Sequence, residues 1–330
     1  MATVQLNLAL SGAANGRSLN FSWPDIALLR LGEILRDSGY RFTTVTPATH
    51  ERVNGAAPLW ARNLRDVFGW SRPFRQEILL RPMLELMHNA KVIAADGEGW
   101  RSTVRFSTLD DRIFVHSAFP TIADDAVFFG PDTYRFCAFV QRFLQPGSLY
   151  VQRACDIGCG SGAAALAIAH TFPAADIYAV DINETALRMT GINAVLATAI
   201  NVVATHSNLY SDVDGDFDLI VANPPYMVDP KKRAYRHGGE QHGAALSLAI
   251  VDAALPRLTP GGTLLLYTGA AVIDGEDLFQ RAVYERLKET GMRWRYDEID
   301  PDVFGEEVGR DGYRDVERIA AIGLTVTRPL

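Results

Sequence analysis

The feature that most constrains the fold is a glycine-rich turn at residues 156–162, with the sequence Asp-Ile-Gly-Cys-Gly-Ser-Gly. It lies between an apolar run at 153–157, which predicts a strand, and an alanine-rich run from Ala163, which predicts a helix. Glycines at this spacing let the backbone turn sharply and pass close to a bound ligand. We therefore expect a parallel strand–helix–strand unit with a ligand site at the carboxyl edge of its sheet.

The same strand–turn–helix rhythm continues to the end of the sequence, at the spacing of parallel βαβ units. Seven strands are enough for a complete sheet, so we expect an α/β fold with a Rossmann-like, seven-stranded sheet. The expected strands lie at 153–157, 176–181, 201–206, 217–222, 263–267, 292–299 and 318–327, and the expected helices at 163–170, 184–197, 244–257 and 276–290.

The N-terminal residues follow a different pattern. Helical patterns occur after the N-cap Ser22, near 58–68 and over 74–87, where Pro82 is expected to interrupt the helix. Apolar residues at every second position between 104 and 115 then predict a hairpin. These elements indicate a small α+β domain, and the winged helix is one fold built from them. We expect an N-terminal α+β substrate-recognition domain at 1–125 and a catalytic domain at 126–330.

Composition and charge exclude several classes of protein. The net charge of −7 argues against a protein that coats nucleic acid, because phosphate binding needs clustered Lys and Arg. Three cysteines argue against a disulfide framework, and Cys155 and Cys159 lack a second pair of metal ligands. No apolar run approaches the roughly 18–20 residues of a spanning helix, and the N-terminus lacks a basic start. We expect a cytoplasmic protein without metal and without membrane contact.

Two aspartates suggest what the turn binds. Asp156 stands two residues before the first glycine, where a carboxylate would repel a diphosphate and attract an ammonium group. Asp181 follows the third glycine by nineteen residues and ends the second expected strand, where it can accept hydrogen bonds from ribose hydroxyls. The alternative is an ordinary strand–helix turn whose aspartates cap helices. The pattern favours a nucleoside ligand that carries an ammonium group.

A second motif follows the apolar run at 218–222, which ends in Asn223, Pro224, Pro225 and Tyr226. Two prolines cannot continue a central strand, so the chain must leave the sheet there in a rigid loop. The Asn carboxamide and the Pro224 carbonyl could accept both hydrogens of a planar –NH2 group, with the Tyr ring against its plane. Against this stands the common occurrence of Pro-Pro loops with a partly buried Tyr.

Together the two motifs resemble class I S-adenosylmethionine (SAM) dependent methyltransferases, in the branch with an (Asn/Asp)-Pro-Pro-(Tyr/Phe) motif. That branch includes release-factor glutamine N5-methyltransferases, N6-adenine methyltransferases and guanine N2-methyltransferases of ribosomal RNA. The resemblance covers about residues 128–328 and implies SAM as cofactor. Gly130–Thr133 resembles the branch's element near SAM, and 238–243 its Gly-Gly segment. The residues implied in SAM binding are Thr133, Asp156, Gly158, Cys159, Gly160, Gly162, Asp181, Ile182, Asn208 and Leu209.

The sequence departs from this branch in two places. Asn208 stands where many relatives place an Asp for the adenine amino group, although its carbonyl can still accept. The N-terminal segment is longer than the helical bundle of the glutamine methyltransferases, so their substrate cannot be transferred to this chain.

The resemblance implies N-methylation of a planar amide or exocyclic amine, with Asn223, Pro224, Pro225 and Tyr226 as catalytic residues. The acceptor is then a protein glutamine or a nucleic-acid base. His237 and His242 are interpreted as loop residues rather than acid–base groups. The stretch 60–75, rich in Arg and aromatic residues, is either a nucleic-acid contact or, as we favour, a packed amphipathic segment. The sequence leaves the acceptor and the oligomeric state open.

Two other functions remain open at this stage. One keeps SAM but gives it a small-molecule acceptor, with residues 1–125 acting as a lid. The other is a SAM-binding interaction protein without turnover, which the intact segment 223–226 argues against.

Overall fold

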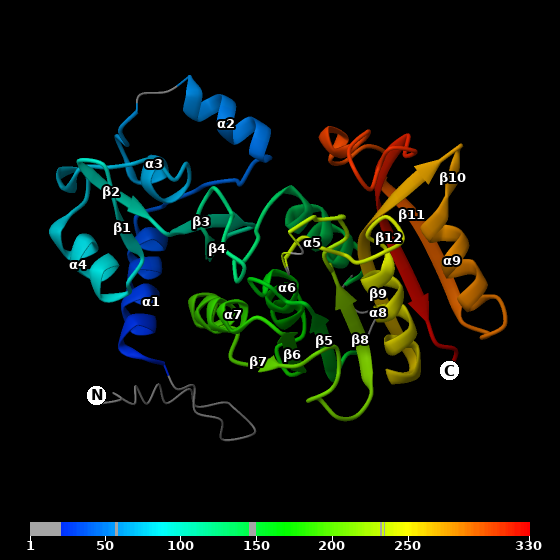
Figure 1. Cartoon of the computed structure of the whole chain (residues 1–330). Coiled ribbons are helices and arrows are strands. Elements are labelled where there is room, and N and C mark those ends of the chain that lie inside the picture. The colour runs from blue at the N-terminus through cyan, green and yellow to red at the C-terminus, as the bar shows by residue number, and fades with distance from the viewer. Residues whose placement is uncertain (1–20, 57–58, 145–149, 232, 234) are drawn as a thin grey trace.

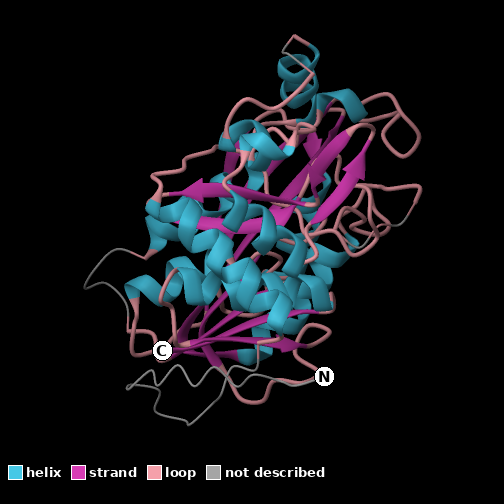
Figure 2. Cartoon of the chain, turned by 90° about the vertical axis from the view of Figure 1, so that its left-hand side faces the viewer, coloured by secondary structure: helices cyan, strands magenta, loops and turns pink. Residues whose placement is uncertain are grey.

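The computed structural model describes residues 21–56, 59–144, 150–231, 233 and 235–330 (Figure 1). The N-terminal residues form a group of helices and two hairpins, and the rest of the chain builds a large sheet with helices against it. Figure 2, coloured by element type, shows that both parts contain helices and strands.

The helices of the N-terminal part agree only partly with the sequence pattern. Helix α1 (Trp23–Asp37) begins at the expected N-cap Ser22. The helix expected at 58–68 is wrong in extent, because α3 covers only Leu64–Phe68. Pro82 lies in the first turn of α4 (Arg81–Asn89) and does not interrupt it, since proline is tolerated there. The other elements are α2 (Pro47–Gly55), the 3-10 helix η1 (Gln76–Ile78) and strands β1 (Ile93–Asp96), β2 (Gly99–Ser102), β3 (Val104–Leu109) and β4 (Arg112–Ser117).

Two hairpins complete this part. Strands β3 and β4 form the expected hairpin, with Leu109 opposite Arg112. Strands β1 and β2 form a second hairpin that the sequence did not predict, because its first strand exposes its central residues and lacks an apolar alternation. The α+β composition is therefore confirmed. The winged-helix form and the boundary at 125/126 stay predictions.

The expected seven-stranded sheet is confirmed. Its strands lie in the order β11-β12-β9-β8-β5-β6-β7, and β12 runs antiparallel to both neighbours. The five strands from β9 to β7 are parallel to one another. The strands are β5 (Arg153–Ile157), β6 (Asp176–Asp181), β7 (Val202–His206), β8 (Phe217–Ala222), β9 (Leu258–Ile273), β11 (Arg293–Asp300) and β12 (Arg318–Thr327), and the two-residue β10 (Glu276–Asp277) pairs with β9.

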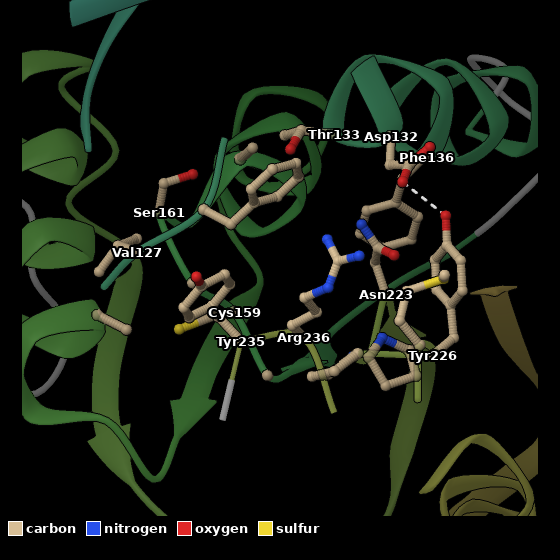
Figure 3. A pocket seen from close by; sticks show the side chains of 18 of the residues that line it. Val127, Asp132, Thr133, Phe136, Cys159, Ser161, Asn223, Tyr226, Tyr235 and Arg236 are labelled. Atoms are coloured by element: carbon tan, nitrogen blue, oxygen red, sulfur yellow. Dashed lines mark hydrogen bonds between the residues drawn. The ribbon is translucent and has the colours of Figure 1, made fainter. Parts of the chain in front are cut away.

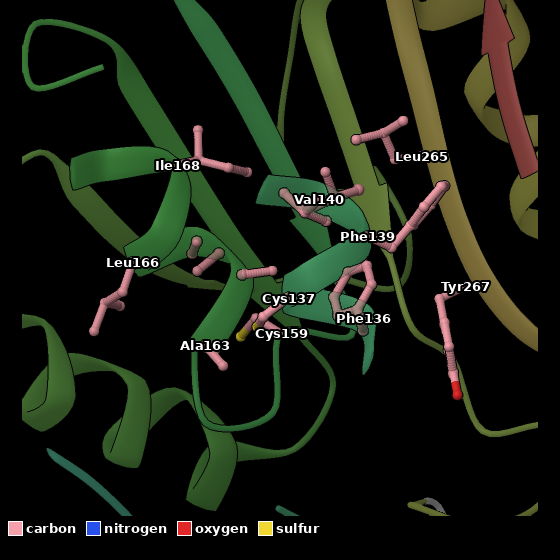
Figure 4. Close-up of a cluster of buried hydrophobic side chains, with 14 of the residues drawn as sticks. Phe136, Cys137, Phe139, Val140, Cys159, Ala163, Leu166, Ile168, Leu265 and Tyr267 are labelled. Atoms are coloured by element: carbon pink, nitrogen blue, oxygen red, sulfur yellow. The ribbon is translucent and has the colours of Figure 1, made fainter. Parts of the chain in front are cut away.

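Alternate residues of the parallel strands enter two different cores, because successive side chains point to opposite faces of a sheet. In β8, Leu219 and Val221 pack against one set of helices, and Ile220 and Ala222 against the other. Figure 4 shows part of the first core. Helices α5 (Pro131–Phe143), α6 (Ala163–Thr171) and α7 (Glu184–Leu196) contribute to the first core, and α8 (Ala245–Ala254) and α9 (Leu278–Leu287) to the second; η2 (Leu255–Arg257) and η3 (Gly305–Glu307) are short 3-10 turns.

Helix α7 joins the two parts of the molecule. Met189 and Ile192 pack with apolar residues of α1 and of the hairpin β3–β4. The fully buried Asn193 accepts a hydrogen bond from the Val115 amide at 2.8 Å and donates to the Val115 carbonyl at 3.0 Å. The same amide group donates to the carbonyl of Ser161 at 2.9 Å. One side chain therefore holds both the N-terminal hairpin and the glycine-rich turn.

Candidate active site

The glycine-rich turn leaves β5 and enters α6, as the sequence predicted. Gly158, Gly160 and Gly162 have φ angles of 65°, 55° and 77°, in the left-handed region that side chains rarely adopt. A Cβ atom at Gly158 or Gly160 would meet no protein atom within 4 Å. The turn is therefore a backbone cradle that faces open space, which fits a ligand lying against it.

Asp156 is almost completely buried at the start of this cradle, with 2% of its surface exposed. Its Oδ2 accepts a hydrogen bond from the Ala165 amide at 3.0 Å, in the first turn of α6. Burial, together with the nearby negative charge of Asp181, raises the pKa of Asp156 to about 7, against the effect of that hydrogen bond. Asp156 lines the pocket. That its carboxylate attracts an ammonium group of a ligand stays a prediction.

Asp181 occupies the end of the neighbouring strand β6. Its two oxygens accept hydrogen bonds from the amides of Gly160 at 3.0 Å and Asn183 at 2.9 Å. Burial raises its pKa, while these backbone hydrogen bonds act in the opposite direction. The carboxylate is thus fixed beside the cradle, with lone pairs left for the hydroxyl groups of a ligand.

The motif 223–226 follows β8, the strand next to β5. Ile157 and Ala222 are paired across these parallel strands, so Gly158 and Asn223 leave the sheet side by side. Two loops that lie sixty-five residues apart in the sequence therefore face the same space at the carboxyl edge of the sheet.

Tyr226 is anchored beneath this loop. Its hydroxyl donates to Asp132 Oδ2 at 2.6 Å, as Figure 3 shows, and only 5% of its surface is exposed. Tyr267 donates to Asp132 Oδ1 at 2.9 Å. A Cβ at Gly269 would lie 2.2 Å from the Tyr226 ring, so glycine is required for this packing. Asp132 thus fixes the loop 223–226 to α5 and β9.

A following segment supports the loop from the other side. Met227 donates its amide to the Arg236 carbonyl at 3.0 Å and accepts from Gly238 at 2.9 Å. A Cβ at Gly243 would lie 2.1 Å from the Tyr226 carbonyl oxygen. His237 accepts a hydrogen bond from the Asp229 amide at 3.2 Å, which fits the interpretation of this histidine as a loop residue.

One pocket of about 420 Å³ brings these motifs together. Every expected site residue lines it except Gly162, which lies at the start of α6. The residues that line it are Thr133, Asp156, Gly158, Cys159, Gly160, Asp181, Ile182, Asn208 and Leu209 on the expected cofactor side, and Asn223, Pro224, Pro225 and Tyr226 on the expected acceptor side.

Other parts of the wall were not predicted. The first turn of α2 contributes Thr46, Pro47 and Ala48, and the connection between β11 and β12 contributes Phe304. Arg236 extends into the pocket from the segment after the loop 223–226 (Figure 3). The available signals were local: Thr46 followed by proline is a helix start, and seventeen residues separate the last two strands. Neither signal indicates that the segment reaches the pocket.

The described residues include no group of three or more His, Cys, Asp or Glu side chains arranged to hold a metal ion. The three cysteines are free and buried. Within the same described ranges, no helix is long and apolar enough to cross a membrane.

Comparisons with known proteins agree with these two motifs. The sequence model of the family described as "Methyltransferase small domain" matches residues 138–283. The release factor glutamine methyltransferase of Deinococcus radiodurans is 34% identical over 125 residues, covering 34% of this chain and 44% of that protein. The ribosomal protein uL3 glutamine methyltransferase of Neisseria meningitidis serogroup A is 35% identical over 132 residues, covering 36% of this chain and 43% of that protein.

A third relative is the release factor glutamine methyltransferase of Mycobacterium leprae, 36% identical over 148 residues, covering 40% of this chain and 50% of that protein. The match to this chain thus spans half or less of the length of each of these curated relatives. Among solved structures, M. jannaschii tRNA m1G37 methyltransferase is similar with a TM-score of 0.48 and 18% identity, covering 72% of this chain and 59% of that chain.

The region that carries both motifs therefore matches the family described as "Methyltransferase small domain" and is similar to curated methyltransferases. The curated relatives that it resembles are named as glutamine methyltransferases of release factors and of ribosomal protein uL3.

Proposed function

We propose that the protein transfers the methyl group of SAM to the side-chain amide nitrogen of a glutamine in another protein. The observation that carries this proposal is the pairing of Ile157 with Ala222, which sets the glycine cradle and Asn223 side by side. The relatives' names supply the acceptor class. Because those relatives are named for release factors and a ribosomal protein, they also support a cytoplasmic location.

The residues of the pocket fit the cofactor. Asp181 would hold the ribose hydroxyls, the cradle at 158–162 would pass along the methionine part, and Asp156 would face its ammonium group. Asn208 follows β7 and can accept from the adenine amino group. When bound, SAM supplies a methyl group already activated on a sulfonium.

The acceptor nitrogen needs orientation because its lone pair is delocalised into the amide. Asn223 Oδ1 and the Pro224 carbonyl would accept its two N–H groups and aim the lone pair at the methyl carbon. As the N–C bond forms and the C–S bond breaks, positive charge develops on nitrogen, and these hydrogen bonds strengthen. The acceptor nitrogen, still held by these two carbonyl groups, would then release a proton to water.

Two observations favour an amide over a nucleic-acid base. The ring of Tyr226 is buried and tied to Asp132, so it has little free face to stack on a base. The arginines of the stretch 60–75 are partly neutralised, since Arg72 and Arg62 both pair with Asp66, at 2.8 and 3.1 Å. These contacts support the packed interpretation of that stretch.

The decisive experiment incubates the protein with isotope-labelled SAM and, separately, release factors, ribosomal protein uL3, RNA, DNA and a metabolite fraction. We expect label in a protein fraction, with mass spectrometry placing one methyl group on a glutamine side chain. Label in nucleic acid or in metabolites alone would contradict the proposal. Binding of SAM without transfer to any fraction would favour the interaction protein.

A further inference from the structure

The connection between β11 and β12, residues 301–317, forms part of the pocket wall. Phe304 lies in it with a φ angle of 56°, in the left-handed region where a bulky side chain is a rare exception. Such conformations persist where the surrounding structure imposes them, and they gather at functional sites. The partly exposed ring of Phe304 lines the pocket.

Several contacts hold the ring in place. It meets the Tyr226 ring edge to face, at 5.9 Å between centroids and 72° between planes. The Arg236 guanidinium carbon lies 5.8 Å from the Phe304 centroid. Tyr313, from the same connection, accepts the Val228 amide at 2.8 Å just after the catalytic loop. The connection is thus braced directly against the loop that carries Asn223.

Arg236 has donors left for a ligand. Its Nη2 donates to Glu307 Oε1 at 2.9 Å, and no other hydrogen bond of its guanidinium is found in the described part of the chain. The other arginine of the wall, Arg135, is engaged by Asp132 and Asp300 at 3.1 and 2.8 Å. Figure 3 shows Arg236 reaching into the pocket on the side of Asn223. Its side chain is 26% exposed, so its free N–H groups are accessible.

We propose that Phe304 and Arg236 form the acceptor subsite, and that Phe304, rather than Tyr226, provides the aromatic face for the planar amide. Arg236 donates to a main-chain carbonyl of the same peptide segment, for which a planar guanidinium with several donors is well suited. The subsite therefore takes an extended peptide that carries a glutamine. This inference rests on the proposed function and extends it to how the peptide is held.

The test uses the full chain and a bisubstrate probe, a short peptide whose glutamine nitrogen is linked to the 5′ carbon of adenosine. Calorimetry compares it with S-adenosylhomocysteine, which lacks the peptide. Phe304→Leu should weaken probe binding by about 2- to 10-fold, the scale of an aromatic contact, and Phe304→Tyr should restore it. Arg236→Gln should weaken it by roughly 10- to 100-fold, the scale of a charged hydrogen bond.

The control is Arg314→Gln, an arginine of the same connection that is 78% exposed and pairs with Asp311 outside the pocket. It should bind the probe like the wild type, and all variants should bind S-adenosylhomocysteine equally. Wild-type binding of the probe by both Phe304→Leu and Arg236→Gln would overturn the subsite while leaving the proposed function intact. If the wild-type protein bound the bisubstrate probe no more tightly than S-adenosylhomocysteine, that result would instead overturn the proposed function.

Discussion

At the scale of single residues, substitution of Asn223 should distinguish methyl transfer from cofactor binding. Its backbone position is fixed by the strand β8 and the prolines after it, and the residue lines the pocket. Asn223→Ala should leave a glutamine –NH2 with one acceptor in place of two. We expect turnover to fall by about 10²–10³, the cost of one lost transition-state hydrogen bond, and SAM binding to change only a few-fold.

Turnover and calorimetry on the same preparation check this expectation. Equal losses in SAM affinity and turnover would mean that Asn223 only supports the loop. Undiminished turnover would mean that the acceptor is not held by this residue at all.

Asp156 predicts a pH dependence of stability. Its pKa rises from about 4 in the unfolded chain to about 7 in the folded protein. Between these values the folded state keeps a proton that the unfolded state has lost, so this group lowers stability as pH rises from about 4 to 7. Asp156→Asn removes the titration and can keep the hydrogen bond from Ala165. The free energy of unfolding of the variant, measured relative to that of the wild type, should therefore be larger at pH 8 than at pH 5.

Urea unfolding of both proteins at the two pH values measures this difference, and other titrating groups cancel in the comparison. A mutant-to-wild-type difference that is the same at pH 5 and pH 8 would show that the carboxylate does not carry the raised pKa.

At the scale of elements, the start of α1 ties this helix to α7. The Ser22 amide donates to Asp25 Oδ2 at 2.9 Å, and the Arg188 guanidinium binds the same carboxylate. Burial acts to raise the pKa of Asp25, but the hydrogen bonds from Ser22 and Arg188 outweigh it and lower the pKa. The stabilisation is therefore present above the ordinary pKa of about 3.9 and is lost as the pH falls below it.

Ser22→Ala should cost about 1 kcal/mol of unfolding free energy at pH 7, as for other N-caps. Asp25→Asn should be more destabilising at pH 7 than at pH 3, because the stabilisation from the lowered pKa begins to be lost once the pH falls below the ordinary value. Chemical denaturation at both pH values provides the measurement, with Glu33→Gln on the same helix as a control for a surface ion pair. An Asp25→Asn effect of the same size at pH 3 would contradict the assignment.

The elements also show what the sequence could and could not reveal. Strands β5, β6, β8 and β12 match their predicted bounds, because strands that are largely buried are apolar runs between turns, whether they are parallel like the first three or antiparallel like β12. Helix α5 was missed, although Pro131 at its first position is a start signal. The motif residues were found because their spacing is local. Phe304 and Arg236 were not, since only tertiary packing brings them into the same pocket as the loop 223–226.

At the scale of the whole molecule, the N-terminal part contributes to the pocket wall through the start of α2. Ala48 is exposed and lines the wall. Ala48→Trp should raise the KM for the acceptor by about 10-fold or more, since overfilling a site typically costs 1–3 kcal/mol, and should change SAM affinity little. Glu51→Trp, on the same helix but away from the pocket, is the matched control.

Acceptor kinetics and SAM calorimetry on these two variants provide the test. Equal kinetics for Ala48→Trp and the wild type would remove α2 from acceptor recognition, and the N-terminal part would then serve stability alone.

The buried side-chain amide of Asn193 connects two segments that are distant in the sequence. It bonds to the carbonyl of Ser161 in the glycine-rich turn and to both backbone groups of Val115 in the N-terminal hairpin. A ligand that immobilises the cradle therefore also restrains the hairpin. Thermodynamic linkage makes such communication reciprocal. An acceptor that engages the N-terminal part must raise the affinity for the cofactor by the same factor by which the cofactor raises the affinity for the acceptor. Cofactor and acceptor would then bind as a cooperative pair.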